Sequence, residues 1–183
     1  MGRCCQSLTA NRARGMSGGM IASLPHEYLG AEARARIALI ASSYRRLLGR
    51  DLVAGGQPSD DADPVVALWQ APLAIVAHGL EADPVFFFGN RAALAAFETT
   101  PAAITAMPSR LSAEPLARDE RQALLDRVSA QGFIDDYAGM RISAKGRRFR
   151  IGQAVVWNLI DAAGEPHGQA ACFVPPEWAR EQA

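Results

Sequence analysis

The sequence predicts an α+β fold, in which an antiparallel sheet of about five strands has helices covering one face and an amphipathic helix on its N-terminal side. Three observations lead to this prediction. Two short apolar runs, rich in branched and aromatic residues, lie near the middle of the chain. Three longer strand-like segments follow one another toward the end, separated by turns that contain glycine. Helical periodicity occupies the stretches before and between these two groups.

The composition is typical of a globular chain with a core. Of 183 residues, 49% are hydrophobic, which suits one domain of ordinary size with an extension. Nineteen basic residues balance nineteen acidic ones, so net charge favours neither nucleic acid nor a membrane as partner. No apolar run approaches the ~20 residues that span a bilayer. Three cysteines, two of them adjacent, suit a reducing compartment, and we expect a cytoplasmic protein.

The chain divides into four predicted parts. A mobile tail rich in Gly, Ser and Arg comes first, and Met1, Met16 and Met20 are alternative start sites within it. N-terminal helices and a loop follow, then the core domain, then a short C-terminal tail. The boundaries of these parts are 1–23, 24–71, 72–176 and 177–183.

Residues 24–48 show the periodicity of an amphipathic helix that ends at Gly49. Two interpretations of its apolar stripe remain open: the stripe packs on its own domain, or it joins two copies of the chain in a homodimer. A loop rich in Gly, Asp and Pro then leads to a short helix over 64–69, because proline suits a first helical turn. The stripe consists of Ile37, Ile40, Tyr44, Leu47 and Leu48.

Two apolar strands are predicted at 72–78 and 85–88, joined by a turn. Asn90 follows the second strand and is placed to cap a helix over 91–97, since an asparagine oxygen accepts the free N–H groups of a first turn.

The remaining elements alternate between helical turns and long strands. Prolines and cap residues divide 99–115 into short helical turns, before a regular helix over 119–130. Three strands, at 133–143, 147–160 and 168–174, then form an antiparallel meander. In the second of these strands, side chains alternate between two faces, as in a half-buried strand. One face has Arg148, Arg150, Gly152 and Ala154, and the other has Phe149, Ile151, Gln153 and Val155.

This layout resembles that of PAS-type domains. The capped helix in GNRAAL and the two hairpins, KGRRFR and DAAGEPHG, match the arrangement of that family. More specifically, the chain resembles the MEKHLA domain family, which is related to PAS, over about residues 37–173. The matching segments are SYRRLLGRDL, ALWQAPLAIVAHGLEADPVFFFGNRAAL, MPSRLSAEP, RQALLDRVSAQGFIDDYAGMRISAKGRRFRI and VVWNL. The resemblance implies that the sheet is PAS-like.

The MEKHLA family includes stand-alone bacterial proteins and the C-terminal parts of plant class III homeodomain–leucine-zipper regulators. This sequence resembles the bacterial stand-alone form, because it lacks the homeodomain and the zipper, so the resemblance does not imply DNA binding. It implies a sensory or protein-interaction role, with light, oxygen or redox state suggested as inputs. We therefore expect a signalling module that acts on a downstream protein.

Known PAS cofactors find little support in the sequence. A covalent flavin photoreceptor needs a cysteine on the helical segment that faces the pocket, and 90–115 contains none. Haem needs an axial ligand, usually histidine, but structural roles fit His26, His78 and His167 better. No set of His, Cys, Asp and Glu has the spacing of a metal site. Cys172 is expected to be a small buried residue, and the cofactor, if any, stays unknown.

Neither catalysis nor nucleic-acid binding is expected. Asp135–Asp136 and Glu81/Asp83 are carboxylate pairs in or beside turns, where acidic groups accept backbone N–H donors. Ser109 lacks the context of an activated nucleophile. A basic cluster is expected to form solvated or ion-paired surface, with Asp135, Asp136 or Glu114 as partners. Its members are Arg141, Lys145, Arg147, Arg148 and Arg150.

The candidate site is a cavity between the helices and the sheet, which in a PAS-like fold can hold a small organic molecule. Arg110 can grip a carboxylate through two hydrogen bonds, or it can brace its own loop through Glu114 or a backbone carbonyl. The candidate lining residues are Asn90, Arg110, Tyr137, Arg141, Trp157 and His78.

Three functional hypotheses follow. The first is a non-catalytic sensory module that binds a small organic ligand in this cavity. The second is a ligand-free interaction or dimerisation module that uses the helical stripe or the outer face of the sheet. The third is a small-molecule enzyme, such as a lyase or isomerase, for which His78 is the residue to test.

Overall fold

The computed structural model describes residues 23–53, 63–113, 124, 127–128 and 130–182. These residues form a five-stranded antiparallel sheet with the order β2-β1-β5-β4-β3, and the predicted fold class is confirmed. The first strand therefore lies between the second and the last. The strands are β1 (Ala74–His78), β2 (Phe86–Gly89), β3 (Phe133–Ile142), β4 (Arg148–Ile160) and β5 (Pro166–Phe173).

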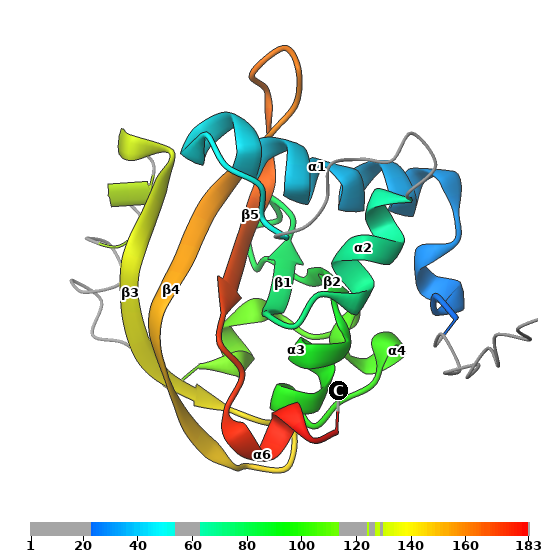
Figure 1. The fold of residues 1–183 in the computed structure, drawn as a ribbon, viewed down its shortest axis with the longest axis vertical. Helices are drawn as coiled ribbons and strands as arrows, with labels where there is room; N and C mark the ends of the chain where they lie inside the picture. The colour runs from blue at the N-terminus through cyan, green and yellow to red at the C-terminus, as the bar shows by residue number, and fades with distance from the viewer. Residues whose placement is uncertain (1–22, 54–62, 114–123, 125–126, 129, 183) are drawn as a thin grey trace, which may run out of the picture.

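Helices lie on both faces of this sheet. Figure 1 shows α1 crossing the sheet near the β4–β5 hairpin, with α3 and α4 toward the opposite end of the view. No helix among the described residues is long and apolar enough to cross a membrane. The helical elements are η1 (His26–Tyr28), α1 (Ala31–Leu48), α2 (Pro64–Gln70), α3 (Arg91–Phe97), α4 (Pro101–Ile104), η2 (Ser109–Ser112) and α6 (Glu177–Arg180).

Helix α1 packs its apolar stripe on its own sheet. Ile37 and Ile40 are fully buried, and the Tyr44 ring meets Trp157 of β4 edge-on, with 5.0 Å between ring centroids. The indole N–H of Trp157 donates to the Ile40 carbonyl at 3.2 Å. Gly49, with φ of 69°, ends the helix in the left-handed conformation that glycine adopts without strain. The first interpretation of the stripe is thus the one that the structure shows.

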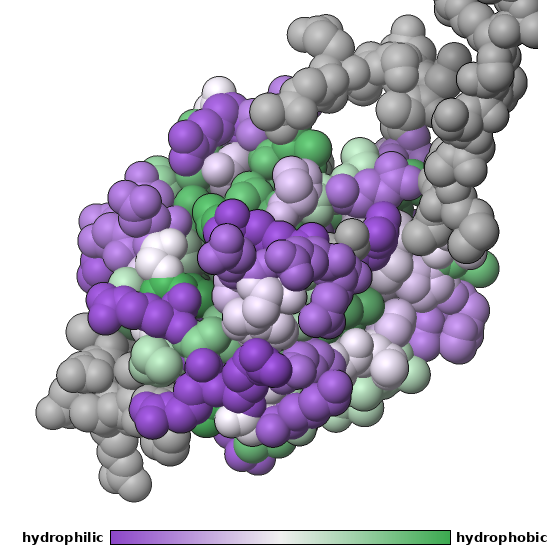
Figure 2. Space-filling model, turned by 60° about the horizontal axis from the view of Figure 1, so that its bottom comes forward, coloured by the Kyte–Doolittle hydropathy of each residue, from purple (hydrophilic) through white to green (hydrophobic). Residues whose placement is uncertain are grey.

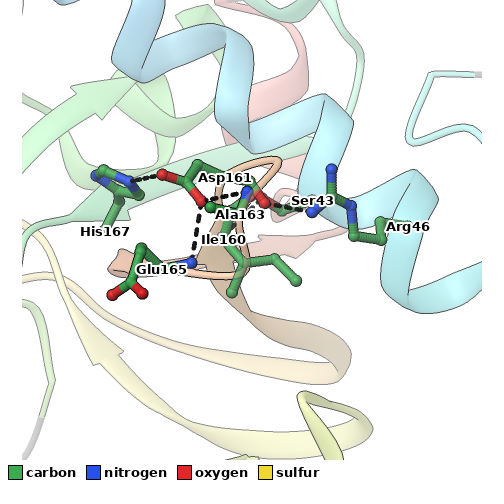
Figure 3. Close-up of polar contacts among 7 residues, drawn as sticks. All are labelled: Ser43, Arg46, Ile160, Asp161, Ala163, Glu165 and His167. Carbon is green, nitrogen blue, oxygen red and sulfur yellow. Dashed lines mark hydrogen bonds and ion pairs between the residues drawn. The ribbon is translucent and has the colours of Figure 1, made fainter.

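Helix α1 is also fastened to the β4–β5 hairpin (Figure 3). The Ser43 hydroxyl donates to the Ile160 carbonyl and accepts from the Ile160 N–H, both at 2.9 Å. Arg46 donates to the carbonyl of Asp161. The Asp161 carboxylate accepts two N–H groups of its own turn and lies 3.1 Å from His167. These bonds join two segments that are 117 residues apart.

A bulge interrupts the regular alternation predicted for β4. Phe149 and Ile151 are buried and face α3, as the alternation requires, but Gln153 has a φ of 51° and is exposed. Ala154 then joins the face of Ile151, because the three residues Tyr137 to Gly139 of β3 oppose the four from Ile151 to Ala154. An extra residue of this kind moves every later side chain to the other face.

Three predicted boundaries need correction or lie outside the description. The helix expected from residue 24 begins at Ala31, because Pro25 and Gly30 separate it from the short turn η1. The predicted tail at 177–183 begins with helix α6, whose Ala179 is fully buried and whose Trp178 packs on Phe149. Of the helix predicted at 119–130, residues 124, 127, 128 and 130 are described and are helical.

Candidate functional site

A cavity of about 140 Å³ lies on the sheet face opposite α1. Its floor is a row of cross-strand neighbours, Val76 of β1, Ala171 of β5 and Val156 of β4. Ala171 and Val156 are only half-buried, although both lie in strands with a neighbour on each side. Their exposure therefore arises from the space above the sheet.

Aromatic and branched side chains form the apolar walls. Phe97 of α3 and Phe173 of β5 meet edge-on, with 6.1 Å between their centroids, and both line the cavity. Phe86 of β2 and Ile151 of β4 close the sides. All four are buried, so the enclosure is made by the core itself.

The helical turn η2 borders the cavity and is held in place by the β1–β2 segment. The N–H of Ser109 donates to the Pro84 carbonyl at 2.7 Å. Arg110 pairs with Asp83 through its Nε, at 2.9 and 3.1 Å from the two carboxylate oxygens. The bracing that the sequence suggested for Arg110 thus runs to Asp83, and Glu114, the suggested partner, lies outside the described residues.

The inner face of β3 contributes Tyr137 and Arg141. A Cβ placed on Gly139 between them would lie 2.7 Å from the Tyr137 hydroxyl, so the tyrosine ring rests against the bare glycine. The Arg141 guanidinium stacks on this ring, 5.1 Å from its centroid. Glycine at position 139 therefore lets Tyr137 lie along the strand instead of across the cavity.

Two further polar groups, His78 and Gln169, lie on neighbouring strands at the cavity. The Nδ1 of His78 lies 2.9 Å from the Gly79 carbonyl, which only accepts, so this nitrogen carries the proton. The Gln169 amide donates to Asn158 at 3.2 Å.

The structure brings together four of the six predicted site residues: His78, Arg110, Tyr137 and Arg141 all line the cavity. The prediction for the other two is corrected. Asn90 is fully buried, and its amide is occupied by backbone groups of α2, β1, α3 and the segment that joins α2 to β1. Trp157 faces α1, because the bulge at Gln153 reverses the direction of the later side chains of β4.

Several lining residues were missed from the sequence. Ser109, Ser112 and Gln169 are polar, and Phe97 and Phe173 are apolar. Gln169 had a usable signal, since it is a polar side chain in an otherwise apolar strand. The serines had none, because short helical turns carry no periodicity from which a direction can be inferred.

The basic cluster does not form one surface. Lys145 and Arg147 lie 3.8 and 3.5 Å from Glu98, and Arg147 also stacks on Trp178. A hydrogen bond from Ser143, helped by these two cations, lowers the pKa of the Glu98 carboxyl. Ion pairing is thus the role that the structure gives to two members of the cluster, although Glu98 was not among the predicted partners.

Figure 2 turns the lower end of Figure 1 toward the viewer and shows hydrophilic residues over most of this face, with small hydrophobic patches between them. Of the partners suggested for the basic cluster, Asp136 pairs with Arg127 at 2.7 Å, and Glu114 lies outside the described residues. Among the described residues, no three His, Cys, Asp or Glu side chains could hold a metal ion. Burial raises the pKa of the Cys172 thiol to about 11, which keeps it protonated.

Solved structures show the class of the fold. The PAS domain of a protein from Colwellia psychrerythraea matches 60% of this chain and 91% of its own, with a TM-score of 0.52 and 13% identity. An RNA-binding light-oxygen-voltage receptor matches 73% of this chain and 39% of its own, with a TM-score of 0.55 and 18% identity. At these identities the likeness shows the PAS-type fold and nothing further.

Sequence comparison identifies the family. The homeobox-leucine zipper protein HOX32 of Oryza sativa subsp. japonica is 34% identical over 147 residues, which are 78% of this chain and 16% of that protein. REVOLUTA of Arabidopsis thaliana, another homeobox-leucine zipper protein, is 29% identical over 134 residues, 73% of this chain and 16% of its own. The chain thus spans less than a fifth of these relatives. Residues 34–179 match the MEKHLA domain, and the chain therefore belongs to the MEKHLA domain family.

Proposed function

We propose that this chain is a non-catalytic PAS-type sensory module whose cavity binds a small organic molecule. The observation that carries the proposal is the water-accessible floor of interior strands, where Ala171 and Val156 remain half-buried under an apolar enclosure. Close packing fills such positions in an ordinary core, so a space kept open there supports a binding role.

The polar groups around the cavity support binding more than catalysis. His78 is held by the Gly79 carbonyl, and no Asp or Glu is among the described lining residues. A general acid–base mechanism needs a titratable group with a partner that tunes it. The described lining thus offers guanidinium, hydroxyl and amide groups that can hold a ligand, and these groups favour binding.

The packing of α1 bears on which surface a dimer could use. Because α1 packs its stripe on β4 and the hairpin, a dimer through this stripe would have to undock the helix. A homodimer or a signalling partner would instead use another face. Sedimentation equilibrium across a wide range of protein concentration measures whether such a dimer exists.

Native mass spectrometry of the purified protein, compared with denaturing conditions, tests ligand binding. We expect a stoichiometric small-molecule mass that denaturation releases, or thermal stabilisation by members of a small-fragment collection. Ala171→Leu fills the floor and should abolish both effects while the protein stays folded. Ala95→Leu is the matched control, because Ala95 is also half-buried but lies on α3 outside this cavity.

Two outcomes would contradict the proposal. In the first, neither an endogenous ligand nor any fragment binds the wild-type protein. In the second, Ala171→Leu and Ala95→Leu bind fragments equally well, which would place binding outside the cavity.

A further inference from the structure

We infer that the cavity selects small carboxylic acids with a compact apolar body, such as an acid with a single aromatic ring, and that Arg141 holds the carboxylate. This inference rests on the proposed ligand-binding role of the same cavity. It adds the chemical class of the ligand and the residue that recognises it.

The described residues that line the cavity carry charge of one sign only. Arg110 and Arg141 both line it, and the described lining residues include neither Asp nor Glu. Arg110 is already neutralised by Asp83, and both of its contacts with that carboxylate run through Nε. Arg141 pairs with no acidic side chain among the described residues. Its contacts are the Tyr137 ring and a long hydrogen bond of 3.4 Å to the Met140 carbonyl.

A half-buried guanidinium with no counter-charge in the described part of the chain is an unusual feature. Arginine rarely leaves water without an anionic partner, because desolvation of the charge is costly. The ring of Tyr137 compensates only in part, since a cation–π contact contributes about 0.5–2 kcal/mol. A carboxylate on Arg141 would complete the compensation through two parallel hydrogen bonds.

The orientation of Arg141 is fixed in advance. Gly139 leaves room for the Tyr137 ring to lie flat along β3, and the guanidinium rests on that ring. A planar group held by stacking loses little side-chain entropy when it binds a carboxylate. Tyr137 is therefore the positioning residue for Arg141.

The apolar part of the cavity sets the size of the ligand. The whole cavity has a volume of about 140 Å³, and Phe86, Phe97, Phe173 and Ile151 form its apolar walls. This is close to a cavity of about 150 Å³ that accepts benzene in another protein. One aromatic ring, or a branched chain of similar volume, fills this space with its acid group at the rim.

The test compares acids with their neutral isosteres. Benzoate and phenylacetate are titrated into the full chain, with benzamide and phenylacetamide as controls, and binding is followed by chemical shifts of the β3 and β5 amides. We expect the acids to bind about 10–100-fold more tightly than the amides, as a charged hydrogen bond implies. Arg141→Gln should remove this preference and leave amide binding unchanged.

Two variants sharpen the assignment. Arg150→Gln removes the same charge from the exposed face of β4, opposite Met140, and should keep the preference for acids. Gly139→Ala drives the Tyr137 hydroxyl toward the cavity and should weaken acids and amides alike. The inference is overturned if amides bind the wild-type chain as tightly as acids, or if Arg150→Gln and Arg141→Gln lower acid binding equally. If neither acids, amides nor other fragments bind, the proposed function itself fails.

Discussion

Replacing Asn90 by alanine should be among the most destabilising single changes in this fold. The Asn90 side chain is fully buried between the end of β2 and the start of α3. Its Oδ1 accepts the N–H groups of Ile75 (2.9 Å) and Ala93 (3.0 Å), so it caps α3 and also ties the helix to β1. Its Nδ2 donates to the carbonyls of Leu68, Ala71 and Leu73, which end α2 and lead into β1.

The size of the effect follows from which groups lose their partners. Loss of the helix cap costs about 1 kcal/mol. The buried N–H of Ile75 then has no acceptor, which costs about 1–3 kcal/mol. Leu68 is spared because its carbonyl also accepts the N–H of Ala71, whereas the carbonyls of Ala71 and Leu73 lose a donor. We expect Asn90→Ala to lower the free energy of unfolding by about 3–5 kcal/mol.

Urea unfolding followed by tryptophan fluorescence and far-ultraviolet circular dichroism measures this loss. Thr100→Ala is the matched control, because Thr100 caps α4 by a single bond at an exposed position, and it should cost only about 0.5–1 kcal/mol. The reasoning is refuted if the two variants lose stability within 1 kcal/mol of each other.

Asn90→Asp separates the two halves of the side chain. It keeps the acceptor but directs a carboxylate oxygen at three carbonyls, which should raise the folded-state pKa of the new group above its unfolded value. Its stability should then be greatest below about pH 4 and should fall as the pH rises toward that higher pKa. A pH-independent loss would show that the donors contribute little.

Three further predictions concern other parts of the chain. Burial raises the pKa of Tyr28 to about 12. The free energy of unfolding should therefore be unaffected below pH 10 and fall by about 2–3 kcal/mol between pH 10 and 12. Tyr28→Phe should lack this alkaline loss when unfolding is measured as a function of pH. The hydrogen bond from His167 is the main cause that lowers the pKa of the Asp161 carboxyl. His167→Ala should therefore raise this pKa in an NMR titration and reduce the loss of stability at pH values below the usual carboxyl range. An unchanged pKa would exclude the contact. Gly168→Ala places a methyl group 2.0 Å from a backbone carbonyl of β1, at a φ of 130°, and should lower stability by about 3 kcal/mol or more. Gly164→Ala in the same hairpin has open space around its new methyl group and should lower stability by about 1–2 kcal/mol. Equal thermal midpoints for the two variants would contradict this prediction.

Local signals predicted the elements well. Helix α3 begins and ends where the sequence indicates, because Asn90 caps it and the apolar spacing is short and regular. Each of the five strands lies within two residues of its predicted bounds, since turns with glycine or proline flank them. These features depend on neighbours in the chain, and a single sequence contains that information.

The cavity lining was harder to predict, and β4 shows why. Continuous alternation along β4 would place Trp157 on the face of Ile151, which lines the cavity. The positive φ of Gln153 reverses that assignment, yet glutamine gives no local sign of a bulge. The irregularity follows from the pairing of β4 with β3, where four residues of β4 oppose three of β3. Pairing between distant strands sets such a register, so periodicity within one strand does not reveal it.

The contact between α1 and the β4–β5 hairpin has a consequence for the newly made chain. Ser43 leaves the ribosome 117 residues before Ile160, its hydrogen-bonding partner, and synthesis at about 5–20 residues per second separates them by roughly 6–23 s. During that interval the apolar stripe of α1 has no sheet to cover it. The helix is made first and docks late, so its stripe is a surface that chaperones can bind during translation.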